Sequence, residues 1–171
     1  RGTILSRIRA HNQIETEKKW RSFLNDETKE YIIKKFNFDC KIKLYKDNLL
    51  SKGIYNNSFE IHELKYLKST LRKGDVFFDI GANIGLFTII AASKIGKKGK
   101  VYSFEPTAQT FSQLVNNITF NNSKNTMPLN FAVSDKNESL YINLNDDNNS
   151  ALNSVTRTPN RGSTEMINSI S

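Results

Sequence analysis

A glycine-containing corner separates two apolar segments of different character. Residues 76–80 form a short apolar run typical of a strand buried on both faces, and residues 84–92 are typical of an apolar helix. The corner between them reads Gly81-Ala82-Asn83-Ile84-Gly85. Such a corner leaves room for a ligand against bare backbone and directs free helix N–H groups towards it. The sequence therefore predicts a ligand site between this strand and this helix.

Glu105 is a second residue whose side chain could bind a ligand. It follows another short apolar run, residues 100–104, at roughly the spacing of about 20 residues expected for a carboxylate that binds ribose hydroxyls. Pro106 favours an extended backbone at Glu105, which holds the carboxylate at the strand end. Ligands of parallel sheets bind beyond the carboxyl ends of the strands. The corner and Glu105 together predict a ligand that contains adenosine.

Two such ligands, NAD and S-adenosylmethionine, place different demands on the corner. A dinucleotide pyrophosphate calls for G-x-G-x-x-G, but Asn83 stands where the second close glycine would be. Asparagine tolerates a left-handed backbone and adds an amide able to bind a carboxylate or an amine. Asp79 brings a negative charge that would repel a pyrophosphate but suits a cationic methionine moiety. The corner favours the methyl donor, and an NAD-dependent oxidoreductase remains the alternative enzyme.

The elements that position these residues alternate between strand and helix. After the corner helix and the strand at 100–104, Thr107 is placed to cap a further helix, and a third strand is predicted over residues 129–133. This order predicts an α/β fold, half of a doubly wound parallel sheet with right-handed crossovers. Residues 140–144 alternate as a fourth strand that need not be parallel.

Four segments are predicted along the chain. A helix is expected over residues 13–36 with a break at Asn25-Asp26, and a second, lead-in helix is expected to start near Asn57 or Ser58 and to end by Gly74. The segments are residues 1–38, a helical N-terminal part; 39–74, a hairpin and the lead-in helix; 75–145, the ligand-binding core; and 146–171, a polar tail.

Composition narrows the class of protein. A chain of 171 residues is long enough for one domain with a real core. Its net charge of +8 comes from scattered lysines that are not interleaved with aromatic residues, which argues against a nucleic-acid partner and leaves a basic interaction module as the non-enzyme alternative. A single cysteine, Cys40, excludes an internal disulfide, and no signal-like start or long apolar segment is present. These features favour the cytoplasm and no membrane span.

Three motifs taken as a set resemble the FkbM family of S-adenosylmethionine-dependent methyltransferases. They are VFFDIGANIG, KVYSFEPTAQTFSQLVNNITFNN and NFAVSD, and IYNNSFEIHELKYL resembles the family's lead-in helix. The resemblance runs from about Leu44 to Leu144. It implies a Rossmann-like class I methyltransferase fold, S-adenosylmethionine as cofactor and a small-molecule or glycan hydroxyl as acceptor. It also implies site residues: Asp79, Gly81, Asn83 and Gly85 at the methionine end, Glu105 at the ribose, and the backbone near Ala132 at the adenine.

The family pattern continues with a strand carrying a segment that resembles KIDVEG, and residues 145–171 contain nothing similar. We therefore expect an incomplete sheet, either in an N-terminal, donor-binding fragment of a longer enzyme or in a degenerate copy, and the start at Arg1 rather than Met points to a longer protein. No catalytic base and no metal site are predicted. His11 and His62 belong to no recognisable constellation, and Cys40 is expected to face inward.

Glu60 and Glu63 lie one turn apart on the predicted lead-in helix, where a solvated face is the commoner explanation. Because the segment that carries Glu60 is expected to pass near the mouth of the cofactor site, Glu60 is the one of the two that merits inspection.

Overall fold

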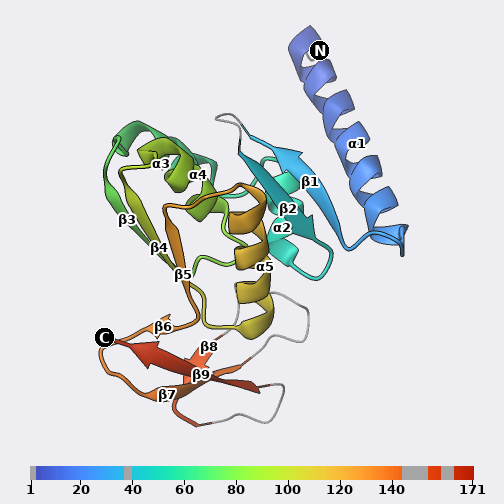
Figure 1. The fold of residues 1–171 in the computed structure, drawn as a ribbon. Helices are drawn as coiled ribbons and strands as arrows, with labels where there is room; N and C mark the ends of the chain where they lie inside the picture. The colour runs from blue at the N-terminus through green and yellow to red at the C-terminus, as the bar shows by residue number, and fades with distance from the viewer. Residues whose placement is uncertain (1–2, 37–39, 144–153, 159–163) are drawn as a thin grey trace.

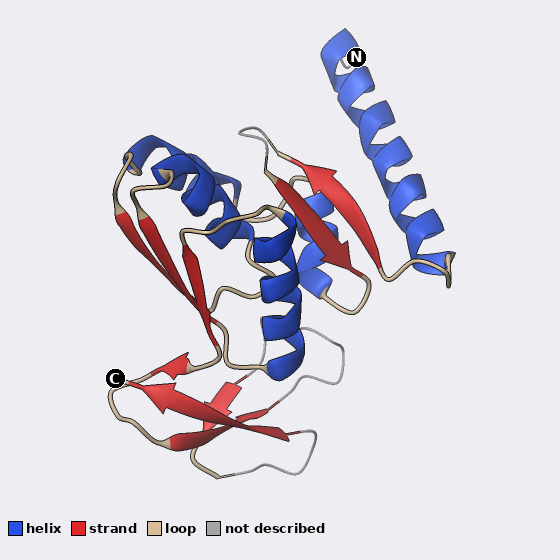
Figure 2. Cartoon of the chain, in the orientation of Figure 1, coloured by secondary structure: helices blue, strands red, loops and turns tan. Residues whose placement is uncertain are grey.

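The computed structural model describes residues 3–36, 40–143, 154–158 and 164–171. The strands of this part of the chain form three sheets, in the orders β1-β2, β3-β4-β5 and β6-β9-β7-β8 (Figures 1 and 2). The β3-β4-β5 sheet is the central one, because the predicted ligand residues lie at its strand ends.

The central sheet is parallel. It consists of β3 (Val76–Ile80), β4 (Lys100–Phe104) and β5 (Thr126–Leu129), with Phe78 opposite Tyr102 and Tyr102 opposite Met127. The helices α4 (Leu86–Ile95) and α5 (Ala108–Phe120) make the crossover connections that parallel neighbours require. The prediction of an α/β fold with a parallel sheet is confirmed.

Helix α4 is buried on nearly all sides. Ile89 and Ile90 are each 1% exposed and share a core cluster with Ile42 and Leu44 of the N-terminal hairpin. Its far end packs with Val101 of β4 in a second cluster. A helix that is apolar all round is stable only inside a protein, so α4 joins the central sheet to the N-terminal part of the fold.

The hairpin of the N-terminal part lies earlier than predicted: it pairs residues 31–35 with 41–45, and residues 49–55, within the predicted hairpin and lead-in segment, form a separate helix. The N-terminal part consists of α1 (Ile4–Asn25), β1 (Tyr31–Lys35), β2 (Lys41–Tyr45), α2 (Leu49–Tyr55) and α3 (Ile61–Thr70). The predicted break at Asn25 is confirmed, but the prediction of helix over residues 31–35 is wrong. This aromatic and β-branched segment pairs with β2 in an antiparallel hairpin, and the neighbouring strand satisfies its backbone hydrogen bonds.

Helix α3 starts later than predicted, at Ile61, with Glu60 as its N-cap residue. The two predicted caps have other partners: Asn57 Oδ1 accepts a hydrogen bond from Lys34 Nζ at 2.7 Å, and Ser58 Oγ donates to the carbonyl oxygen of Gly53 at 3.2 Å. The helix end at Thr70, ahead of Gly74, agrees with the prediction.

The strand predicted over residues 129–133 is divided between two sheets. β5 ends at Leu129, and β6 (Ala132–Val133) pairs with β9 (Thr164–Ile170) instead. Asn130 lies at the division, and its side-chain amide donates to the carbonyl oxygens of Glu105 and Pro106 at 2.8 and 2.9 Å. These bonds turn the chain away from the central sheet, which explains why one apolar run serves two sheets.

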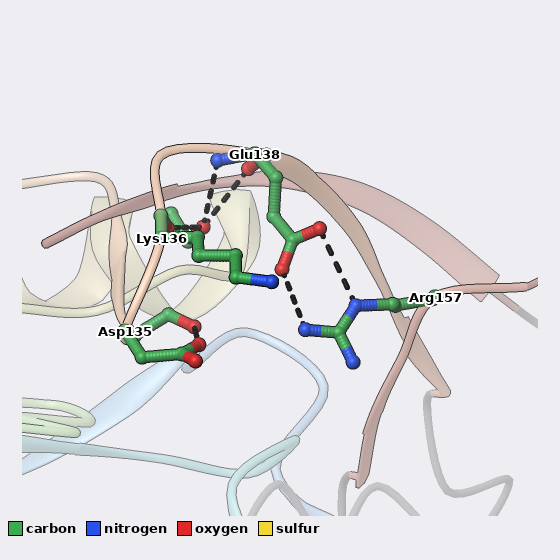
Figure 3. Close-up of polar contacts among 6 residues, drawn as sticks. Asp135, Lys136, Glu138 and Arg157 are labelled. Atoms are coloured by element: carbon green, nitrogen blue, oxygen red, sulfur yellow. Dashed lines mark hydrogen bonds and ion pairs between the residues drawn. The ribbon is translucent and has the colours of Figure 1, made fainter.

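The C-terminal sheet also includes β7 (Ser139–Asn143), which is antiparallel to both β8 (Ser154–Thr156) and β9. The segment predicted as a polar tail thus contributes two strands, although its residues 146–153 and 159–163 lie outside the described part. Leu140, Ile142 and Ile167 form a small core cluster. In Figure 3 the Arg157 guanidinium donates to both oxygens of Glu138, at 3.0 and 3.4 Å. This ion pair is exposed, so it contributes little to stability.

One face of the central sheet is bare. The outward side chains Val76, Phe78 and Ile80 of β3 are 58–64% exposed, and Met127 of β5 is 55% exposed. Within the described residues, the expectation that the first strand is buried on both faces is therefore wrong. Helices α4 and α5 both lie on the opposite face (Figure 1), where Val101 and Ser103 are fully buried.

No helix in the described ranges is long and apolar enough to cross a lipid bilayer.

Candidate functional site

The glycine corner turns the chain sharply at the carboxyl end of β3. Three of its residues have left-handed backbone: Gly81 with φ +75°, Asn83 with φ +49° and Gly85 with φ +89°. Glycine adopts this region without strain, and asparagine tolerates it better than most residues. The residue types of the corner are thus explained by the turn that carries the strand into α4.

The backbone N–H groups of the corner itself, residues 81–85, are all engaged within the protein. Those of residues 81 and 82 both donate to the carbonyl oxygen of Phe104 at 2.9 Å, and those of residues 83, 84 and 85 donate to Glu105 Oε2, Asn83 Oδ1 and the carbonyl oxygen of Ala82 at 3.0, 2.8 and 2.8 Å. The corner folds back onto the end of β4, and this contact uses its donors. No N–H group of residues 81–85 is left to hold a phosphate.

The Glu105 side chain is 6% exposed and well anchored. Its Oε2 accepts from the Asn83 N–H, and its Oε1 accepts from the N–H and the hydroxyl of Thr107 at 3.1 and 2.8 Å. Burial raises the pKa of this carboxyl, while the bonds from Thr107 and Asn83 oppose the rise. A carboxylate offers roughly four acceptor positions, so one remains, on Oε2, for a ligand hydroxyl.

Asn48 is a site residue that sequence reasoning missed. Its side-chain amide donates to Asn83 Oδ1 at 2.8 Å, and its own Oδ1 accepts from the Leu50 N–H as the N-cap of α2. In the sequence it was visible only as a turn residue before an apolar segment, which is also the signature of an N-cap. The pair connects α2 to the corner, so the amide oxygen of Asn83 is already engaged inside the protein.

Asp79 lies behind the corner rather than in front of it. It is 8% exposed and accepts a hydrogen bond from the Thr88 hydroxyl of α4, whose oxygen lies 2.8 Å from Ser103 Oγ. Burial raises the pKa of the Asp79 carboxyl, and its bonds from Thr88 oppose the rise. Its charge therefore acts from beneath the corner, without direct contact with the space that a ligand would occupy.

A cavity of about 370 Å³ opens at the carboxyl ends of β3 and β4. Three of the predicted residues line it, Gly81, Asn83 and Glu105, and so does Glu60. The rest of the wall is apolar apart from backbone: Leu50, Ile54, Phe59, Ala82, Ile84, Leu86, Phe87, Pro106 and Ile142. Within residues 3–36, 40–143, 154–158 and 164–171, no lysine, arginine or histidine lines the cavity. The wall thus combines apolar surface with two carboxylates.

The other predicted residues do not line this cavity. Asp79 and Gly85 lie against α4, and Ala132 packs on the core cluster of the C-terminal sheet. His11 and His62 are exposed and outside the cavity wall. Cys40 faces inward as expected, with its sulfur 3.6 Å from the carbonyl oxygen of Ile89. In the described ranges, no cluster of at least three His, Cys, Asp or Glu residues is arranged to hold a metal ion.

A larger cavity of about 600 Å³ lies at the amino ends of the central strands. Lys97, Lys100 and Lys124 line it, close to the C-terminal end of α4. The amide of Asn125 there donates to the carbonyl oxygens of Ala92 and Gly96 at 2.9 and 3.0 Å. Cations and amide donors at a helix C-terminus complement its partial negative charge, so these residues are explained by helix termination.

Gly85→Ala is expected to lower the free energy of unfolding by about 2–3 kcal/mol, because it combines left-handed strain with overpacking. A Cβ at this position would lie 2.7 Å from Cδ1 of Leu114, which is fully buried. The matched control is Gly81→Ala, where nothing lies within 4 Å of the added Cβ and only strain of about 1 kcal/mol applies. Urea unfolding of both variants measures the difference, and equal losses would contradict the proposed clash.

Asp79→Asn is expected to flatten the pH dependence of stability. Because the pKa of Asp79 is raised in the folded state, the folded protein binds more protons than the unfolded chain between the unfolded and the folded pKa. This contribution to stability is present at low pH and is lost as pH rises through that window. The melting temperature of the variant relative to that of the parent should therefore rise between pH 4 and pH 7. Parallel curves would contradict the assignment.

The model of the family described as "Methyltransferase FkbM domain" matches residues 79–169, more than half of the chain. No curated protein matches.

Solved structures match over part of the chain. The structure of M. jannaschii TYW2 in complex with AdoMet is 29% identical, with 59% of this chain and 43% of that chain covered and a TM-score of 0.48. Trm5b from Pyrococcus abyssi is 19% identical, with 66% and 34% covered and a TM-score of 0.47. A putative rRNA methylase from Clostridium thermocellum is 21% identical, with 42% and 39% covered and a TM-score of 0.40.

The chain spans about two fifths of the length of the first solved structures that it matches. The family match, in contrast, contains the glycine corner, Glu105 and most of the C-terminal sheet. The chain belongs to the FkbM family of S-adenosylmethionine-dependent methyltransferases.

Proposed function

We propose that the cavity at the glycine corner binds S-adenosylmethionine, and that the chain is the donor-binding part of an enzyme that methylates a hydroxyl oxygen of a sugar or natural product. The observation that carries the donor site is the composition of the cavity wall. As far as the structure describes the chain, the wall combines a buried carboxylate that retains one acceptor position with an apolar surface free of cations.

The residues of the cavity fit the donor. Glu105 Oε2 is placed to accept a hydrogen bond from a ribose hydroxyl. Bare backbone faces the cavity at Gly81, because nothing lies within 4 Å of its missing Cβ. A volume of about 370 Å³ is within the range of small-molecule sites. Once bound, the sulfonium of the donor supplies an electrophilic methyl group, and the contribution of the chain is to bind and orient it.

Charge and hydrogen bonding separate this donor from NAD. A pyrophosphate needs backbone donors or cations, whereas the N–H groups of residues 81–85 are engaged internally and the described part of the cavity wall contains neither lysine nor arginine. Glu60 and Glu105 would repel phosphates and attract the cationic methionine end. These observations support the methyl donor against the oxidoreductase alternative.

The acceptor class rests on the family resemblance. We assign no general base within the described residues. The bare apolar face of the central sheet supports a donor-binding part rather than a complete catalytic unit, since parallel sheets are ordinarily covered on both faces. A cytoplasmic setting is part of the same proposal.

Calorimetric titration of the folded chain with S-adenosylmethionine, with NAD as the control ligand, tests the donor site. We expect saturable binding of the first ligand and none of the second. Binding of NAD alone would favour the oxidoreductase. If neither binds while heparin binds in a salt-sensitive manner, the donor site is rejected in favour of the basic interaction module.

A further inference from the structure

Glu60 places a second carboxylate on the wall of the donor cavity. It is the residue directly before α3, far in sequence from the corner, yet it lines the same space as Gly81, Asn83 and Glu105. Its side chain is exposed and does not cap α3. Within the described residues, its carboxylate forms no hydrogen bond or ion pair, so the structure gives it no role in holding the fold together.

The backbone at Glu60 is unusual for its residue type. Its φ of +43° and ψ of +46° lie in the left-handed region, which glycine and asparagine occupy at lower energy. Every other described residue with positive φ is a glycine or an asparagine: Asn57, Gly74, Gly81, Asn83, Gly85, Gly96 and Asn122. A glutamate at such a position is unfavourable for folding, which indicates that its side chain serves another purpose.

The charged neighbours of Glu60 are acidic. Partial burial, Glu63 and Asp79 raise the pKa of its carboxyl, in that order of importance, and no cation opposes the rise. Glu105, the other carboxylate of the wall, is buried. The protein as a whole carries a net charge of +8, but among the residues that the structure describes no lysine or arginine lines this cavity. The cavity therefore lacks the positive charge that would balance its carboxylates.

We propose that Glu60 is a specificity residue that recognises the positive charge of the sulfonium, and so distinguishes the methyl donor from its demethylated by-product. The inference rests on the proposed function of the cavity. Loss of the methyl group leaves the sulfur as a neutral thioether, while the ribose and the amino and carboxyl groups of the ligand are unchanged. A carboxylate facing the sulfur stabilises the charged ligand and not the neutral one, which favours donor binding and by-product release.

The two ligands form a matched pair that isolates this charge. The Kd values of S-adenosylmethionine and S-adenosylhomocysteine are measured by calorimetry for the parent chain, for Glu60→Gln and for Glu63→Gln. We expect Glu60→Gln to weaken the binding of S-adenosylmethionine about five- to tenfold, which is the effect of one partly solvated charge pair. The binding of S-adenosylhomocysteine should weaken by less than about twofold. Glu63→Gln, which removes the same charge one turn away and outside the cavity wall, should change neither.

Glu60→Gly separates recognition from folding. Glycine relieves the left-handed strain, so the melting temperature should stay the same or rise, while the selective loss of S-adenosylmethionine affinity remains. A lower melting temperature, or equal weakening of both ligands, would show that Glu60 acts only on the structure and would overturn the inference. If the folded parent chain binds neither ligand, the proposed function itself fails. If the parent binds both ligands and Glu60→Gln changes the two Kd values equally or not at all, only the inference fails.

Discussion

Glu105→Ala is expected to weaken S-adenosylmethionine binding by between about tenfold and a hundredfold. A hydrogen bond to a charged group contributes about 1.5–3 kcal/mol, and each 1.4 kcal/mol is about a factor of ten in Kd. The substitution removes the acceptor position on Oε2 and also releases the Asn83 N–H that this oxygen holds. Binding should therefore fall both through the lost contact and through a looser corner.

Calorimetry on the variant checks the expected loss, provided that circular dichroism first shows a folded chain. Glu27→Ala is a suitable control, because the substitution removes the same charge from an exposed residue in the turn after α1. The control should bind the ligand like the parent. Undiminished affinity in a folded Glu105→Ala chain would remove Glu105 from the donor site and leave the cavity without its ribose acceptor.

Asn117→Leu is expected to lower the free energy of unfolding by about 3–5 kcal/mol, the range for breaking a buried hydrogen-bond network. Asn117 is fully buried on α5. Its Oδ1 accepts from the Lys43 N–H at 2.7 Å, and its amide donates to the carbonyl oxygens of Lys43 and Ile84 at 3.1 and 2.8 Å. Leucine has a similar volume but would remove the partner of three backbone groups, two on the partly buried Lys43 and one on the buried Ile84.

Asn121→Leu provides the matched control. One turn further along, Asn121 makes the same pair of bonds to Lys41 of β2, at 2.8 and 2.6 Å, but it is only partly buried. Water can replace its contacts, so a loss of about 1 kcal/mol is expected. Guanidinium unfolding followed by the fluorescence of Trp20, the single tryptophan, measures both variants. Equal losses would contradict the importance of burial.

The residue pattern was sufficient to predict the parallel core and three residues that line one cavity. Alternation of apolar strands and helices is a local property, and a corner that needs left-handed backbone restricts the residue types directly. Gly81, Asn83 and Glu105 were therefore identified from sequence, and the structure places all three on one cavity wall. The ends of α1 and α3 were also predicted, since turn residues and glycine terminate helices locally.

The hydrogen-bond partners of several segments could not be predicted from the local residue pattern. Residues 31–35 became a strand because β2 pairs with them, and the run at 129–133 was divided because Asn130 bonds to the end of β4. Asn117 looked like an ordinary polar residue of a helix, yet it serves as the partner of a strand edge. A strand or a buried amide needs a partner in another segment, and the residue pattern of the segment itself does not say which one supplies it.

The sequence by itself thus determined that this protein has a parallel α/β core with a glycine corner and a carboxylate suited to an adenosine-containing ligand. Only the tertiary structure decided that the corner's N–H groups are engaged by Phe104, by Glu105 and by the corner itself, that Asp79 lies behind the corner under α4, and that Glu60 reaches the cavity. The physical reason is that residue types set local backbone preferences, whereas burial, charge environment and the remaining hydrogen-bonding capacity of a site depend on which distant segments pack together.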